Sequence, residues 1–524
     1  MTPISLTTSP MEKKETMTEN SKRKIFLKVA RVGLVAYFVL FALWQLPPLI
    51  HGLRHLCPLR SDGIQETLAV PSFARQTGFA CEVCHTVFPE LTPFGRRFKL
   101  NGYTLTTKPA DVSDTSVTSS TEAAKRNLTL SYVSPLSYDV QIAYSKYNVA
   151  PPDKNAGTKG GPPAGAQTAG DAFLFPEQIS LYYAGRVTDD IGTWIQMTYS
   201  QPAGSLGIDN TELRYTHHSA DRKWLWGTFA NNTPGMEDVY NTALSAFGVP
   251  MFNVPSLYNF GAGSSAASGG LRGPLYQSGT FTNSAGGGEY LWYNDSLYVE
   301  FAGYHSGVPG TIATGNTALN ATGALGAISG VAPKARVSYE EDWGRNALEV
   351  GAMAMDTEFV PPAIGVASMN SPTTANQYMD TGFDWQYQYI GDENIVSFIG
   401  SGVNERQSNN PLFVESGLYS NAIDNLYQTS LTAEYYYKRK YGALVNFVNT
   451  TGTKDALMNG ANGAPNNQYW VFELDYMPWL NTKFILQYDA YTIVDGNQSP
   501  FYGTPAASKA SANNTLVLGL WMDF

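Results

Sequence analysis

The chain has 524 residues, more than one ordinary soluble domain needs, and only 15% are charged, against about 25% in soluble domains. A net charge of −10 argues against nucleic acid as a partner, because phosphates demand a basic surface. With 3 Cys, a disulfide framework is excluded. The 32 Tyr, 49 Gly and 30 Pro disfavour a helical bundle and favour many short strands joined by turns.

The N-terminus has the pattern of an export signal. Basic residues over positions 22–31 precede an apolar run over 32–46, and two prolines then stop any helix. We predict a signal peptide over residues 1–50, and the mature chain then begins somewhere in 50–69, because no clean small-residue cleavage site is visible. The alternative is an uncleaved inner-membrane anchor. Cys57 is a leftover thiol, removed with the leader or inert.

The strongest motif in the chain is Cys81-Glu82-Val83-Cys84-His85. Covalent haem attachment needs two thiols at this spacing and a His directly after them as the proximal iron ligand. A thioredoxin-like redox pair would need a βαβ setting, and a zinc site would need two further ligands nearby; the surrounding sequence offers neither. The motif therefore predicts one haem c bound to Cys81 and Cys84, with His85 on the iron.

The residues around the motif add a family resemblance. The run Ala69-Val70-Pro71-Ser72-Phe73-Ala74-Arg75-Gln76-Thr77-Gly78 precedes the motif, and Pro89, Leu91 to Gly95 and Phe98 to Leu100 follow it. This stretch resembles the fused cytochrome–porins of iron-oxidising bacteria, in which a monohaem segment precedes an outer-membrane barrel. The resemblance is close over residues 69–100 and extends to the rest of the chain only in architecture. It implies that the reductant is ferrous iron.

The predicted haem segment, residues 70–107, is too short to bury a core unaided. Haem supplies part of the missing apolar surface, and the wall of a barrel is the obvious cover for the rest. We therefore expect this segment to be a plug or lid of the barrel. Residues 108–125, rich in Ser, Thr and Asp, read as a linker.

The remaining residues, 126–524, predict an all-β fold: a transmembrane antiparallel barrel. Alternation with period two is clear after Asp380, where Phe383 and Trp385 share one face and Asp384 and Gln386 the other. The strand that closes on Phe524 resembles the signal that the outer-membrane assembly machinery reads. A soluble β-sandwich or propeller is the alternative, and the aromatic density, the loop asymmetry and the export signal oppose it.

The connections fall into two alternating classes. Seven are tight turns, near residues 189–190, 221–222, 294–295, 342–344, 391–392, 439 and 478–481. Eight are longer loops, near 148–174, 202–208, 232–286, 306–333, 357–375, 406–423, 453–466 and 494–512. Fifteen connections make about sixteen strands, with the short turns and both termini on the periplasmic side of the outer membrane.

The second axial ligand of the haem is less clear from the sequence. Of the His residues outside the motif, His217 and His305 share the parity of outward-facing residues, and His51 and His55 lie near the leader. His218 falls on the lumen face beside a periplasmic turn, so we predict it as the distal ligand; a solvated turn histidine is the plain alternative. Met236, Met251 and a five-coordinate iron are further possibilities.

Two classes of function follow. In the first, the chain is an iron-oxidising oxidoreductase that takes electrons from extracellular ferrous iron and passes them through haem to a periplasmic cytochrome or another soluble carrier. In the second, it is a passive porin with a haem gate; between them lies a conduit to an external acceptor. Carboxylates with lumen parity would draw cations inward, although for each one singly ordinary polar lining is the favoured interpretation. These carboxylates are Glu212, Glu300, Asp380, Asp384 and Glu434.

Overall fold

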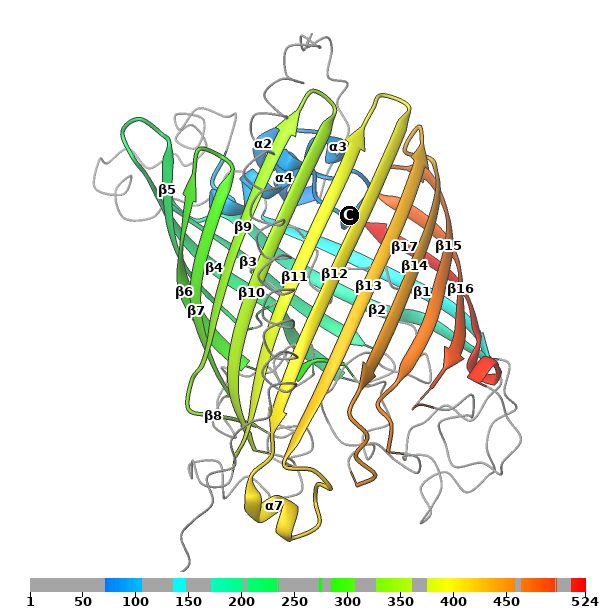
Figure 1. Ribbon diagram of the computed structural model, residues 1–524. Helices are drawn as coiled ribbons and strands as arrows, with labels where there is room; N and C mark the ends of the chain where they lie inside the picture. The colour runs from blue at the N-terminus through cyan, green and yellow to red at the C-terminus, as the bar shows by residue number, and fades with distance from the viewer. Residues whose placement is uncertain are drawn as a thin grey trace, which may run out of the picture. The chain divides into compact units, whose positions relative to one another are not determined.

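A computed structural model shows the architecture (Figure 1). It describes residues 71–105, 135–147, 171–200, 205–232, 234, 273–275, 284–306, 327–360, 375–457, 463–494, 496 and 510–524. The predicted signal peptide and linker lie outside these ranges, as do His51, His55, Cys57, Met236 and Met251. Among the described helices, none is long and apolar enough to cross a membrane.

The strands form one closed antiparallel barrel. Their bounds are β1 Leu136–Tyr147, β2 Asp171–Arg186, β3 Ile191–Ser200, β4 Ser205–His218, β5 Trp224–Asn231, β6 Ser284–Tyr293, β7 Leu297–Ser306, β8 Ala327–Ser329, β9 Ala332–Trp343, β10 Asn346–Val360, β11 Asn376–Ile390, β12 Asn394–Ser408, β13 Ile423–Tyr437, β14 Tyr441–Gly452, β15 Asn467–Trp479, β16 Thr482–Ile493 and β17 Thr515–Asp523. Apart from the short β8, which pairs with β10, each strand pairs with the following one, and β7 pairs with β9. Strand β1 pairs with both β2 and β17, which closes the sheet.

The described sheet has 17 strands, but β8 and β9 lie end to end along the same edge of β10. If β8 and β9 are counted as one strand, the barrel has sixteen strands, as the alternation of turns and loops predicts. The split itself was not expected. It falls at Gly330, whose φ of 66° bends the chain between the two pieces.

Side chains alternate between the two faces of the barrel. On β11, Phe383 is exposed while Asp384, Gln386 and Gln388 are buried. On β4, the exposed Leu213 and Tyr215 alternate with the buried Glu212 and Arg214. In a closed sheet, every backbone N–H and C=O group has a hydrogen-bond partner, so a barrel with apolar residues outside and polar residues inside can face lipid. The chain is therefore an integral outer-membrane β-barrel.

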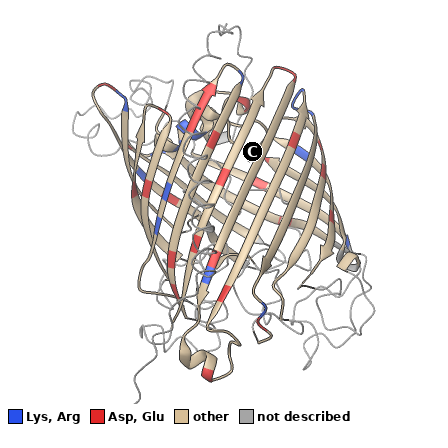
Figure 2. Cartoon of the chain, in the orientation of Figure 1, with Lys and Arg blue, Asp and Glu red and all other residues tan. Residues whose placement is uncertain are grey.

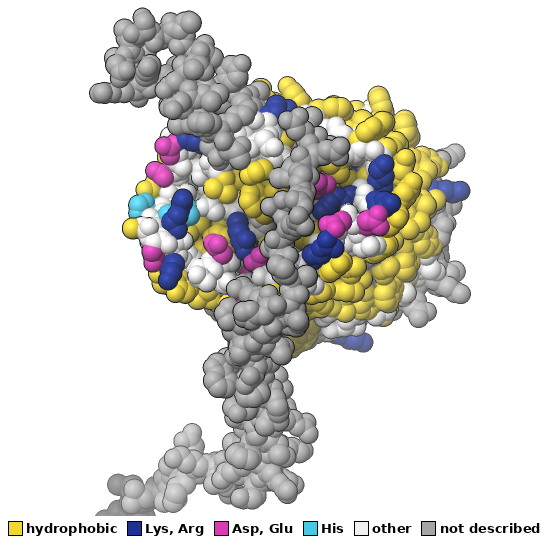
Figure 3. Space-filling model, turned by 90° about the horizontal axis from the view of Figure 1, so that it is seen from above, with side chains coloured by type: hydrophobic (Ala, Val, Ile, Leu, Met, Phe, Trp, Pro, Cys, Tyr) yellow, Lys and Arg dark blue, Asp and Glu magenta, His cyan; other side chains and the backbone are white. Residues whose placement is uncertain are grey.

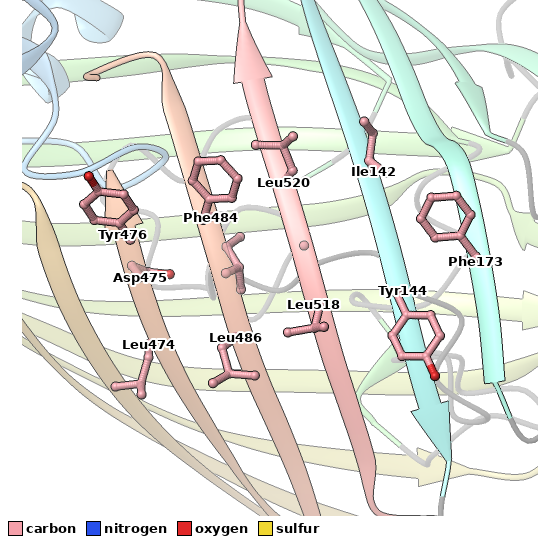
Figure 4. Close-up of a pocket in the computed structure, with 12 residues that line it drawn as sticks. Ile142, Tyr144, Phe173, Leu474, Asp475, Tyr476, Phe484, Leu486, Leu518 and Leu520 are labelled. Atoms are coloured by element: carbon pink, nitrogen blue, oxygen red, sulfur yellow. The ribbon is translucent and has the colours of Figure 1, made fainter. Parts of the chain in front are cut away.

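The outer face is a continuous apolar belt. On β15, β16 and β17 it holds a shallow depression walled by Leu474, Phe484, Leu486, Leu518 and Leu520, whose side chains project from neighbouring strands (Figure 4). The absence of a side chain at Gly519 contributes to the hollow. Apolar lining and an outward position identify the depression as lipid-facing surface.

The short turns lie together at one end of the barrel. In the three-residue turn between β6 and β7, Asn294 and Asp295 both adopt left-handed φ values, 53° and 57°, as the two central residues of a type I′ turn do, and the N–H of Ser296 donates to the carbonyl of Tyr293 at 3.1 Å. At the opposite end, the connection between β12 and β13 carries the helix α7, Pro411–Glu415, capped by the side chain of Asn410. All seven predicted turns join consecutive strands.

Three short helices precede the barrel strands: α2 Pro71–Thr77, α3 Cys81–Cys84 and α4 Pro93–Leu100. Residues 71–105, named here the mouth segment, lie at the short-turn end of the barrel (Figure 1). Figure 3 looks onto this end, where acidic and basic side chains gather at the rim while hydrophobic side chains cover the flank. The segment lies against the barrel, and its identity as a haem-bearing plug or lid stays a prediction.

Candidate functional site

The Cys-x-x-Cys-His motif is folded into a single helical turn. Cys81 and Cys84, three residues apart, bound α3, and the backbone N–H of His85 closes the turn by donating to the carbonyl of Cys81 at 2.8 Å. Residues three apart on a helix lie on the same side. His85 itself is extended, with φ −123° and ψ 138°, and forms an isolated bridge with Leu91.

Thr92 joins this turn to the next helix. Its hydroxyl donates to the carbonyl of Val83 at 2.6 Å and accepts the N–H of Gly95 at 3.1 Å, so one side chain both caps α4 and holds α3. Gly95 permits the close contact, because a Cβ there would lie 2.1 Å from the carbonyl oxygen of Cys84. The motif is thereby fixed against α4.

The ionisation of the motif suits haem attachment better than thiol redox chemistry. Burial raises the pKa of the Cys81 and Cys84 thiols to about 12. A redox pair needs a thiolate stabilised near neutral pH. Burial also lowers the pKa of His85 to about 4, which keeps the imidazole neutral, the form that binds a metal. Its buried Nδ1 has no hydrogen-bond partner among the described residues. This donor set fits a haem c.

A buried ion pair fixes the mouth segment to the barrel. The Nη2 of Arg96 lies 2.6 Å from Oε1 of Glu340 on β9, and its Nε donates to both carboxylate oxygens at 3.1 Å. The same guanidinium donates through Nη1 to Gln388 on β11 at 3.0 Å and to the carbonyl of Leu91 at 2.7 Å. The side chains of Arg96 and Glu340 are only 1% and 2% exposed.

A second contact has the opposite arrangement: here the buried carboxylate belongs to the mouth segment and its partners belong to the barrel. Glu90, five residues after the motif histidine, accepts hydrogen bonds from Gln386 at 2.9 Å, from Gln388 at 3.0 Å and from Ser397 at 3.0 Å. The donors come from β11 and β12. Sequence reasoning missed Arg96, Glu340 and Glu90, because the partners lie 244 or more residues apart and no local pattern connects them.

Apolar contacts complete the attachment on several sides of the barrel. Val87 packs in a buried cluster with Ile395, Tyr436 and Met477, and the ring of Phe88 meets Trp521 edge-on at 5.0 Å. At the other end of the segment, Leu100 packs with the inward residues of β5, β6 and β7, and Tyr103 donates to Glu212 at 3.0 Å. The motif is therefore part of the barrel and not a globule on a tether.

His218, the predicted distal ligand, lies half-buried at the end of β4 with the lumen parity that the sequence indicates. Its described electrostatic neighbours are His217, Arg222, Asp190 and Asp295, all at the short-turn rim. None belongs to the motif, so the structure does not bring His218 to His85 and its role stays a prediction. His217 and His305 are exposed on the outer face, as expected.

The five carboxylates predicted to face the lumen are all buried on the inner wall. Three are held by bases: Glu212 by Arg214, Glu300 by Lys334 at 3.2 Å, and Asp384 by Arg336 at 2.7 Å. For these three, ordinary polar lining is the correct interpretation. Glu434 lies in a different electrostatic setting, with Glu90, Glu473 and Asp475 as acidic neighbours and Lys483 as the base.

Comparison with known proteins finds outer-membrane proteins at low similarity. No family model and no curated protein matches the chain. Among solved structures, the in-vitro folded OmpT of Vibrio cholerae is 9% identical with a TM-score of 0.39, covering 74% of this chain and 96% of that one. The channel DcaP of Acinetobacter baumannii is 13% identical with a TM-score of 0.40, covering 74% and 96%. Salmonella typhi OmpF, in complex with daunomycin, is 11% identical with a TM-score of 0.39, covering 74% and 97%.

Scores at this level carry no inference about function. The strand pairing defines the class by itself: a porin-like, sixteen-stranded outer-membrane barrel.

Proposed function

We propose that this chain is an outer-membrane electron-transfer protein that carries one haem c on Cys81, Cys84 and His85 at the short-turn mouth of its barrel. The supporting observation is the placement of this motif in a segment that buried polar contacts fix inside the mouth. A haem c bound there would alternate between ferric and ferrous states and pass one electron at a time.

The chain's own residues have separate roles in this proposal. The thiols of Cys81 and Cys84 tether the group, and the neutral ring of His85 ligates the iron. Arg96 and Glu90 hold the segment against β9, β11 and β12, so that the motif keeps one position relative to the periplasmic rim. Short turns face the periplasm in barrels of this class, so a soluble periplasmic cytochrome or similar carrier is the proposed acceptor.

The proposed donor is extracellular ferrous iron, as the resemblance of the mouth segment to iron-oxidising cytochrome–porins implies. Among the described residues, no group of three His, Cys, Asp or Glu side chains could hold a metal ion. The proposal is therefore oxidation of loosely held iron by outer-sphere transfer, one electron per ion, and not chemistry at a tight metal site.

A passive porin is the second candidate, and the closed barrel with a polar inner wall favours it. One experiment separates the two. Ferrous iron is added to purified, air-oxidised protein, and the visible spectrum is followed for reduced haem. Reduction with a matching yield of ferric ion supports iron oxidation. A spectrum without haem bands supports the porin, and haem that resists iron but is readily oxidised by external acceptors supports an outward conduit.

A further inference from the structure

The inner wall of the barrel is divided into two electrostatically different parts. From β3 to β12, several of the buried acidic residues are matched by bases, as in Glu212–Arg214, Glu300–Lys334 and the pair of Asp384 and Glu349 around Arg336. From β13 through β17 to β1 and β2, the buried carboxylates greatly outnumber the buried bases. Figure 2 shows how few basic residues the strands of the barrel carry.

The second part is named here the acidic wall. It consists of the buried Asp139, Glu177, Asp424, Glu434, Glu473, Asp475 and Asp489 and the partly buried Asp523. Lys483 is the only buried base on these strands, and its ammonium already lies between Glu473 at 2.9 Å and Asp475 at 3.0 Å. Carboxyl groups therefore greatly outnumber bases on the acidic wall within the described part of the barrel.

Glu177 supplies an independent sign that a cation belongs here. Its residue is 1% exposed, and its Oε2 has no hydrogen-bond partner among the described residues. Its charged neighbour is Asp139, another carboxylate. A buried carboxylate without a partner is costly, and a like charge beside it adds to the cost. Either a proton on one of the two groups or a cation between them would relieve this cost.

The local backbone gives Glu177 this position. The pairing of β1 with β2 shifts between Gln141 and Ala143, so that Phe175, Pro176 and Glu177 stand opposite the single residue Ile142. Irregularities of this kind redirect a side chain out of the regular alternation.

The acidic wall reaches the motif. Asp523 pairs with Asp139 across β1 and β17, and Asp523 is an electrostatic neighbour of Cys81. Glu434 is a neighbour of Glu90 in the mouth segment. The wall also extends away from the mouth, since Asp489 lies seven residues along β16 from its short-turn end at Thr482. The carboxylates thus line the lumen from its middle to the motif.

We propose that the acidic wall concentrates hydrated divalent cations in the lumen and guides them to the Cys81–His85 motif. The mouth lies a full strand length from the long loops: β12 has 15 residues, about 50 Å at 3.3 Å each. A reductant outside the cell therefore approaches the motif through the lumen. In this proposal the ions stay hydrated and mobile, attracted by the carboxylates through water. The inference rests on the proposed function only in naming ferrous iron as the ion delivered.

The first test measures cation binding without redox chemistry. Manganous ion has the charge and the oxygen-ligand preference of ferrous ion, and binding reduces the amplitude of its six-line spectrum in electron paramagnetic resonance. Full-length protein in detergent is titrated with manganous chloride at low and high salt. Wild type should bind the ion weakly and lose it in high salt. Glu177→Gln and Asp489→Asn should each weaken binding about fourfold, the Coulomb effect of one charge about 10 Å from a dication in water.

Glu358→Gln is the matched control. It is the same Glu-to-Gln change on a strand, but Glu358 is exposed between the buried Thr357 and Phe359 of β10 and so points away from the lumen. It should leave manganous binding unchanged. Equal binding in wild type and Glu177→Gln, or an equal loss in Glu358→Gln, overturns the proposal.

The second test measures delivery. Haem reduction is followed by stopped flow with the dication hexaammineruthenium(II), with ferrous iron, and with neutral hydroquinone. The acidic-wall variants should slow the dications about fourfold each and leave hydroquinone unchanged. An equal slowing of both classes indicates a structural defect and contradicts the proposal. If the ruthenium complex shows the charge effect while ferrous iron gives no reduction, the acidic wall stands and the iron assignment fails.

Discussion

Replacing Arg96 by Met should release the mouth segment from the barrel. Met keeps much of the side-chain length but removes the guanidinium, which leaves Glu340 charged and buried and removes the hydrogen bonds to Gln388 and Leu91. Removing one partner of a buried pair costs about 3–5 kcal/mol, because the remaining charge is uncompensated. That cost raises the population of the open segment on the order of a hundredfold to several thousandfold.

The adjacent residue is a matched control. Arg97 pairs with Asp342, but these side chains are 28% and 43% exposed, and an exposed pair contributes about 0–1 kcal/mol. Arg97→Met should therefore raise opening only a few fold. The assay is hydrogen exchange of the α4 amides in full-length protein in detergent, read by mass spectrometry, since exchange through fast opening tracks the open population.

The double variant Arg96→Met with Glu340→Leu tests the cause. If the uncompensated carboxylate is responsible, removing it should restore much of the protection, because apolar pairs commonly replace buried ion pairs without loss. Exchange in Arg96→Met no faster than in Arg97→Met would refute the reasoning, and a double variant as open as the single would show that the charge of Glu340 is not the cause.

Three further predictions concern the motif. Replacing Cys81 and Cys84 together by Ala should abolish haem staining of the denatured band, and persistent staining would rule out thioether attachment. Gly95→Ala forces α4 off the Cys84 carbonyl and should destabilise the segment by about 1–3 kcal/mol and lower the haem content per chain; Gly207→Ala, which meets nothing within 4 Å, is the control. His218→Ala should change the haem spectrum with attachment intact, and an unchanged low-spin spectrum would exclude His218 as ligand.

The strand number and the direction of each side chain could be predicted because they are local properties. Period-two alternation fixes which face a residue joins, and Asp380, Asp384 and Glu434 were assigned correctly on that basis. Turn residues mark each short connection, such as Asn294-Asp295 with its two positive φ values. The position of the mouth segment also followed from a simple quantity, its small size, which cannot support a core by itself.

The contacts that hold the site could not be predicted, because they depend on register around the whole barrel. Arg96 finds Glu340 across 244 residues, and Glu90 finds Ser397 across 307. Parity identifies which residues face the lumen but not their height or their neighbours. For that reason the sequence could not separate Glu300, which is paired with Lys334, from Glu434, which lies among carboxylates.

The difference between paired and unpaired lumen carboxylates bears on the choice between a porin and an electron-transfer protein. A passive pore needs a polar inner wall, and the paired charges from β3 to β12 meet that need without further function. It does not need a buried ion pair that fixes a Cys-x-x-Cys-His turn in the mouth, nor an unpaired carboxylate such as Glu177 facing Asp139. Each costs stability unless something offsets it. In the two proposals, the ion pair of Arg96 holds the motif in place and a cation beside Glu177 would offset the second cost, so variants of both residues test the choice.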